Sequence, residues 1–116
     1  FVAYYCHWHW RRNLFPALSA LSQAYVLTGD TKYAHKAAVM LCRIADFYPR
    51  MDYNKQSRYA EEFLPGYSGR ILYHTWETIT VDVLSACYDL IWDALDQDTA
   101  LQGMWGTDGE GLRAHI

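Results

Sequence analysis

The sequence predicts an all-α fold with three main helices. Apolar residues recur three or four positions apart in three separate stretches, which is the spacing of one helix face. Glycine, proline and cap-forming residues stand at the ends of these stretches. The chain has 116 residues, of which 52% are hydrophobic and 20% charged, so it falls within the size and composition of a single folded domain.

The first helix is expected over about residues 13–28. Asn13 is a suitable N-cap, Pro16 is tolerated in a first helical turn, and Gly29 ends the helix. One apolar stripe runs along it, made of Leu14, Leu18, Leu21 and Tyr25.

The second helix is expected over about 30–48, with Asp30 as its N-cap and Pro49 beyond its end. Because a Thr-Gly-Asp turn joins the two helices, they are predicted to lie nearly antiparallel as an αα-hairpin. Several alanines on the second helix allow a neighbour to approach closely. Its stripe consists of Ala34, Ala37, Ala38, Leu41, Ile44 and Tyr48.

Residues 49–70 break the helical pattern. They mix aromatic and charged residues with Pro-Gly and Ser-Gly pairs, so we expect a long aromatic loop. The glycine-rich tail, 103–116, is also expected to be loop, and the opening YYCHWHW is either a short extended stretch or a helix end. A third helix is expected over about 71–94, with the stripe Leu72, Trp76, Ile79, Val83, Cys87, Leu90 and Ile91.

The charge and hydropathy of the chain argue against two classes of protein, those that bind nucleic acid over their whole surface and those that span a membrane. The net charge of −3 argues against a nucleic-acid-binding surface over the whole chain. No apolar run approaches the ~20 residues needed to span a bilayer. The cysteines are far apart, and Cys42 and Cys87 fall on apolar helix faces, so we expect free cysteines that act as small hydrophobic side chains.

The stretch NLFPALSALSQAYVLTGDTKYAHKAAVMLCRIADFYP resembles an early helical pair of the heparinase II/III-type and related alginate lyases. The later SACYDLIWDAL is similar to a helix of that family with an Ala-x-x-Tyr-Asp pattern, although Tyr88 and Asp89 stand one residue closer to Ala86. The matching positions of the first stretch are Leu18, Leu21, Ala24, Tyr25, Thr28, Gly29, Asp30, Tyr33, Ala34, Tyr48 and Pro49.

This resemblance implies a partial domain, a fragment of an (α/α) toroid, from a polysaccharide lyase that cleaves a uronic-acid-containing glycan by β-elimination. In that reaction one group neutralises the sugar carboxylate, another removes the C5 proton, and a Tyr or His protonates the leaving oxygen. The family's Asn-His pair and catalytic Tyr follow the helix that SACYDLIWDAL resembles, and this chain has no consecutive Asn-His pair. We therefore expect no catalytic residue before Ile116 and no activity of the chain alone.

The resemblance also implies an acidic polysaccharide and the remainder of a longer chain as partners, no cofactor, and a periplasmic or secreted location. Flat aromatic faces stack on sugar rings, and arginine binds carboxylates or sulfates. His74 and Glu77 stand three apart on one helix face, where the carboxylate is placed to hold the imidazole at a cleft. The predicted substrate-binding residues are Trp8, Trp10, Tyr67, Arg70, His74 and Glu77.

Other roles stay open on the residues alone. The aromatics also suit a purely structural role, holding the long loop to the helices, and His74 and Glu77 suit a surface hydrogen bond. His7 and His9 would point the same way from an extended strand, but two ligands are too few for a metal site, so none is expected.

Two other protein classes remain as alternatives. A toroid glycoside hydrolase needs a paired acid and carboxylate, yet Asp82, Asp89 and Asp93 share one helix and no partner on a second helix is identifiable. A tetratricopeptide-like protein-binding scaffold suits the first hairpin, but no second copy follows at a period of about 34 residues.

Overall fold

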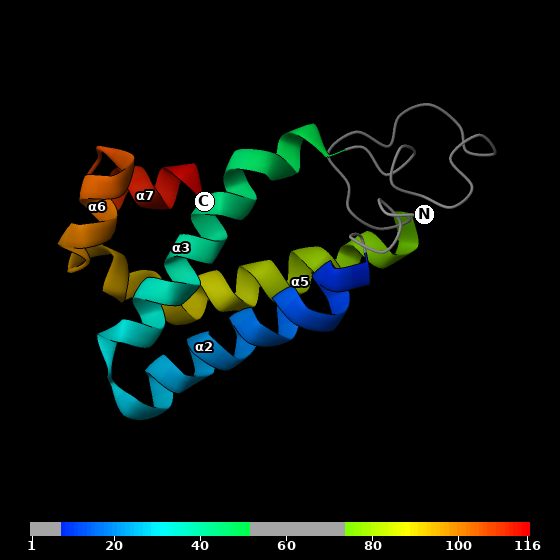
Figure 1. Cartoon of the computed structure of the whole chain (residues 1–116), viewed down its shortest axis with the longest axis horizontal. Coiled ribbons are helices and arrows are strands. Elements are labelled where there is room, and N and C mark those ends of the chain that lie inside the picture. Colours follow the sequence, from blue (N-terminus) through cyan, green and yellow to red (C-terminus); the bar gives the residue numbers. More distant parts are fainter. Residues whose placement is uncertain (1–7, 52–73) are drawn as a thin grey trace.

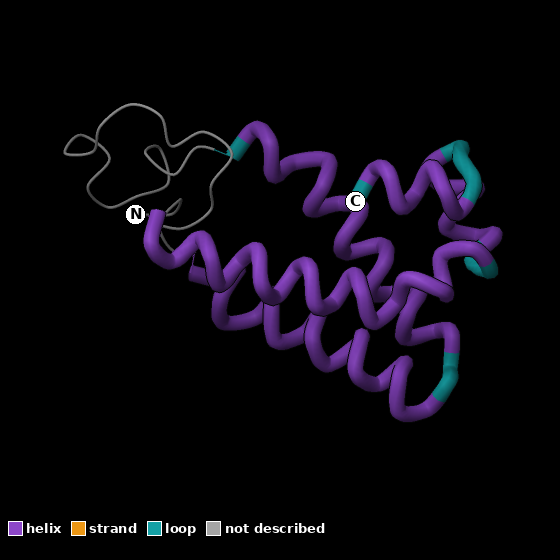
Figure 2. The backbone as a smooth tube through the Cα atoms, turned by 180° about the vertical axis from the view of Figure 1, so that it is seen from behind, coloured by secondary structure: helices purple, strands orange, loops and turns teal. Residues whose placement is uncertain are grey.

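A computed structural model of the chain describes residues 8–51 and 74–116 (Figure 1). These residues form helices and turns, and the described ranges contain no strand, so the predicted all-α class is confirmed (Figure 2). In chain order the elements are the π-helical turn η1 (Trp10–Leu14), α2 (Phe15–Thr28), α3 (Thr31–Phe47), the 3-10 turn η2 (Tyr48–Arg50), α5 (His74–Ile91), the 3-10 segment η4 (Trp92–Asp96), α6 (Thr99–Trp105) and α7 (Gly109–His115).

The first helical run begins earlier than predicted, because residues 8–9 are already helical. Asn13 lies inside this run, so its prediction as the N-cap is wrong, as is the extended form considered for His9. Pro16 explains the wider turn η1. Proline has no N–H to donate to the carbonyl four residues back. The Phe15 N–H, one residue earlier, donates to the Trp10 carbonyl five residues back, which is the π-helical pattern.

The turn between α2 and α3 forms as its residues predict. Gly29 adopts a φ of 68°, a left-handed conformation that glycine takes without strain, and its N–H donates to the Tyr25 carbonyl at 2.8 Å. The Asp30 side chain caps α3 by accepting from the Lys32 N–H at 3.0 Å. The two helices then run in opposite directions, as in an αα-hairpin (Figure 1).

α5 lies alongside α2 and runs in the same direction (Figures 1 and 2). Ser19 Oγ and Cys87 Sγ, 3.7 Å apart, join the two helices by a hydrogen bond. Cys42 and Cys87 are free and buried, which confirms their prediction as small hydrophobic side chains. α5 ends at Ile91, about three residues before the predicted end, and continues as η4.

The tail predicted as loop, 103–116, is helical over most of its length, because its first residues complete α6 and Gly109–His115 form α7. Each short helix begins at an aspartate cap: Asp98 accepts from the Leu101 N–H at 2.9 Å, and Asp108 accepts from the Gly111 N–H at 2.8 Å. The prediction was wrong because it took the glycines as loop signals. A Cβ on Gly109 would lie 2.8 Å from the Asp96 Cα, so this glycine permits close helix packing.

The core lies where α3 meets its neighbours. α2, α5, α6 and α7 all pack against α3, and each contributes at least one buried apolar side chain. Among the described residues, no helix is long and apolar enough to cross a bilayer. The core residues are Leu18, Ala34, Ala37, Ala38, Leu41, Cys42, Ile44, Cys87, Ile91, Ala94, Leu95, Leu101 and Leu112.

We predict that Leu18→Ala lowers the free energy of unfolding by about 2–5 kcal/mol, because it removes buried methyl groups and leaves a cavity. Leu18 is fully buried, whereas Leu27 on the same helix is 84% exposed. Leu27→Ala is therefore the matched control and is expected to change stability by less than about 0.5 kcal/mol. Chemical denaturation measures both variants, and equal effects would contradict this placement of α2.

A second prediction concerns Cys42. Burial raises the pKa of its thiol from the ordinary 9.0 to about 11, with the carboxylates of Asp46 and Asp98 adding to the rise. The folded chain thus holds the thiol proton more tightly than the unfolded chain. This contribution to stability is present below about pH 9 and is lost as the pH rises through about 11. We expect denaturation at a series of pH values to show a shallower alkaline loss of stability for Cys42→Ala, and an unchanged slope would contradict the assignment.

Candidate functional site

A hollow at the start of the described chain brings together an indole, an imidazole and an amide. This N-terminal hollow has a volume of about 360 Å³ and is lined by His9, Trp10, Asn13, Leu14, Ala17 and Met40. Trp10 is half-buried and packs edge-on against Phe15, with 6.2 Å between ring centroids and 71° between the planes. The indole is therefore held by the core while part of it stays open to a ligand.

His9 and Asn13 form a hydrogen-bonded pair in this hollow, with 2.6 Å between Asn13 Nδ2 and His9 Nδ1. An amide nitrogen only donates, so His9 Nδ1 accepts and the ring proton is assigned to Nε2. The pair leaves an imidazole N–H to donate to a hydroxyl or carboxylate oxygen, and the Asn13 carbonyl oxygen to accept from a hydroxyl. Residues four apart face each other on a helix, so the pair was detectable in sequence once this segment was taken as helical.

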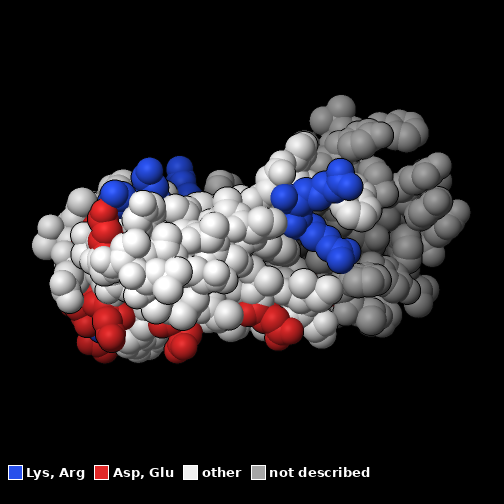
Figure 3. Space-filling view, turned by 90° about the horizontal axis from the view of Figure 1, so that it is seen from below, with Lys and Arg blue, Asp and Glu red and all other residues white. Residues whose placement is uncertain are grey.

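Basic side chains lie on the helical segment that forms part of the N-terminal hollow. Arg11 and Arg12 are both exposed on η1, and Trp8 just before them is 39% exposed. Figure 3 shows two groups of Lys and Arg side chains, one at this end of the described chain and one at the opposite end, while most acidic side chains in that view lie along another edge. The local charge is thus positive although the whole chain carries −3.

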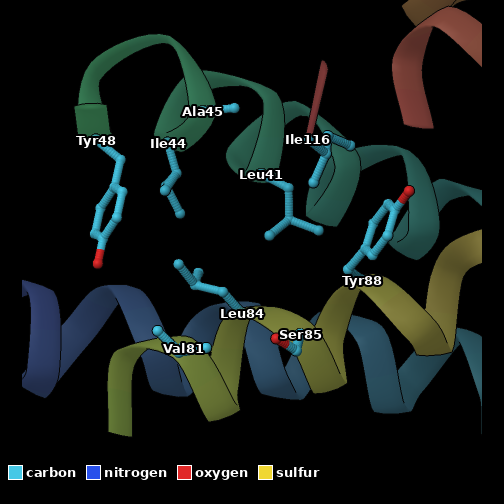
Figure 4. A pocket seen from close by; sticks show the side chains of 9 residues that line it. All are labelled: Leu41, Ile44, Ala45, Tyr48, Val81, Leu84, Ser85, Tyr88 and Ile116. Carbon is cyan, nitrogen blue, oxygen red and sulfur yellow. The ribbon is translucent and has the colours of Figure 1, made fainter. Parts of the chain in front are cut away.

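An apolar groove separates the C-terminal half of α3 from α5, with a volume of about 220 Å³. Leu41 and Ile44 of α3 point across it toward Leu84 of α5, and Tyr48 and Tyr88 stand at its two ends (Figure 4). The remaining lining residues are Ala45, Val81, Ser85 and Ile116. With no cationic side chain in its lining, the groove does not suit an acidic sugar.

The two tyrosine hydroxyls of the groove are held by the protein. Tyr48 donates to the Glu77 carboxylate, and Tyr88 donates to the Arg113 carbonyl at 2.9 Å. Glu77 is buried, so this hydrogen bond partly satisfies a carboxylate that would otherwise be costly to remove from water. Burial also raises the pKa of the Tyr88 phenol, with the charge of Arg113 acting in the opposite direction.

The predicted substrate-binding residues that the structure describes lie in two different parts of the molecule. Trp8 and Trp10 lie together at the N-terminal hollow's end of the chain, and Glu77 lies beside the groove. Tyr67, Arg70 and the side chain of His74 lie outside the described residues, so the His74–Glu77 pair stays a prediction. Within 8–51 and 74–116, no three His, Cys, Asp or Glu side chains converge to hold a metal ion.

Comparisons of the chain with protein-family models, curated proteins and solved structures return no match. Function is therefore inferred from the residues of this chain.

We predict that Tyr48→Phe destabilises the fold by about 1–3 kcal/mol, because it removes a hydrogen bond from a buried carboxylate. Tyr88→Phe is the matched control. It removes the same hydroxyl from a neutral carbonyl acceptor, so its cost is expected to be only about 0.5–1.5 kcal/mol. Thermal or chemical denaturation ranks the two variants, and the reverse order would show that Glu77 does not depend on Tyr48.

Proposed function

We propose that this chain contributes a binding surface for an acidic, uronic-acid-containing glycan, as part of the (α/α) toroid of a polysaccharide lyase. The observation that carries the proposal is the N-terminal hollow, lined by the Trp10 indole and a hydrogen-bonded His–Asn pair, together with Trp8 and two exposed arginines in the same helical segment. The resemblance of the α2–α3 hairpin sequence to heparinase II/III-type lyases is the reason for proposing this enzyme class.

The hollow and the exposed residues of the same helical segment each match one feature of an acidic sugar. An indole face stacks on the apolar side of a pyranose ring while its N–H remains available for a hydroxyl. Arginine presents two N–H groups in a plane, which matches the two oxygens of a carboxylate. His9 Nε2 and the Asn13 amide can donate to hydroxyl or carboxylate oxygens.

The hollow suits binding rather than elimination chemistry. β-Elimination requires a group to neutralise the carboxylate and separate proton transfers at C5 and at the leaving oxygen. Among the residues that line the hollow, His9 is the single titratable one. This surface is therefore assigned to substrate binding and not to proton transfer.

We predict that a uronic-acid oligosaccharide binds the chain and that Arg12→Ala weakens the binding about three- to fivefold, the size of a solvent-exposed charge interaction. Trp8→Ala removes an exposed indole and is expected to weaken the binding by about fivefold. Isothermal titration calorimetry measures the dissociation constant, and the loss should shrink as salt screens the arginine.

The matched control is Arg43→Ala, which removes the same unit charge from an exposed side chain on α3. It should leave binding unchanged, and a neutral glucose oligosaccharide should bind far more weakly than the acidic one. Absence of binding by the acidic oligosaccharide, or an equal loss in Arg12→Ala and Arg43→Ala, would overturn the proposal.

A further inference from the structure

The side of α2 that is turned away from α3 and α5 carries no charge. The whole helix, Phe15–Thr28, contains no Asp, Glu, Lys, Arg or His. Surface helices typically turn charged residues to water, whereas a helix that is apolar on all sides is usually covered. Leu27 is nevertheless 84% exposed and Val26 beside it 57% exposed. The exposed residues that share one helix face, here called the outer α2 face, are Pro16, Ala20, Gln23 and Leu27.

Opposite charges lie on the two sides of the outer α2 face. α3 lies along one side, and its first turns carry Lys32 and Lys36. α5 and η4 lie along the other side and carry Asp82, Asp89 and Asp93. Figure 3 views the molecule from the α2 side. Most acidic side chains line one edge of the uncharged surface there, and the Lys and Arg group at the end away from η1 lies at the opposite edge.

These charges flank the same stretch of α2. The Ser19–Cys87 hydrogen bond sets the register of α2 against α5, and the two helices run in the same direction. Asp93 lies six residues beyond Cys87, which places it alongside the last turn of α2. Lys36 lies in the second turn of α3, which returns along α2 from the Gly29 turn. Both side chains are exposed, and neither forms an ion pair within residues 8–51 and 74–116.

We propose that the outer α2 face binds a second copy of this chain, with the two α2 helices parallel and a twofold axis running between them. Rotation about an axis parallel to α2 places the acidic side of each copy opposite the basic side of the other, so that Lys36 of one copy faces Asp93 of the other. An axis across α2 would instead bring the two acidic sides together. A twofold interface uses one self-complementary face, and this chain supplies both charged sides of it. The contact also removes the two exposed Leu27 side chains from water.

The interface is tested on the 116-residue chain by analytical ultracentrifugation at a series of concentrations. We expect the average mass to rise reversibly from the 13.5 kDa of one chain toward twice that value. A mass that stays at one chain throughout overturns the proposal. Growth past two chains also overturns it, because a twofold interface closes at the dimer.

Leu27→Glu separates dimerisation from folding, because this side chain is almost fully exposed in the single chain. It places an unpaired carboxylate from each copy in the interface, so we expect the dimer to weaken at least about tenfold. Met104→Glu is the matched control. It replaces another exposed apolar side chain with the same charge, on α6, which does not contact α2. Equal weakening by the two variants would overturn the proposal.

Exchanging two charges tests the parallel arrangement. Lys36→Glu and Asp93→Lys are each expected to weaken the dimer about three- to fivefold, because each brings like charges together at an exposed position. The double variant restores opposite charges across the twofold axis, and its dissociation constant should return close to the original value. Losses that add in the double variant would overturn the proposal, and circular dichroism checks the helical content of every variant.

Discussion

The small side chains on the buried face of α3 are the constraint on which the rest of the structure depends. Ala34, Ala37 and Ala38 are almost fully buried, and α2, α5, α6 and α7 all pack against this one helix. A larger side chain at any of the three positions would overfill a tightly packed interior and move a neighbouring helix. The alanine face therefore determines how closely the hairpin partner α2 and the C-terminal helices approach, and with that the shape of every hollow between them.

Several helices pack against α3, and its two ends contact different parts of the chain. Near its first turn, His35 pairs with Asp98 at the start of α6. Near its last turn, Asp46 pairs with His115 at the end of α7, with 3.0 Å between Oδ1 and Nε2. These two His–Asp pairs hold the C-terminal helices to α3 at both ends. Beside the second end of α3, the apolar groove has at its two ends tyrosines whose hydroxyls the protein already binds.

The N-terminal end of the described chain has a different surface chemistry from the apolar groove between α3 and α5. The N-terminal hollow contains the Trp10 indole, and Trp8 and two exposed arginines lie in the same helical segment, which suits an extended acidic sugar that stacks and pairs at the same time.

The sequence by itself determined the helical class, the α2–α3 turn and the buried cysteines, since local spacing and caps specify these: Gly29 supplies a left-handed residue and Asp30 a side-chain acceptor. Tertiary structure alone decided the helicity of the tail, where the buried Leu101 and Leu112 anchor two helices too short to be stable in isolation. It also paired His35 with Asp98, 63 positions away. Spacing rules describe neighbours within an element, and contacts between elements depend on how α3 brings them together.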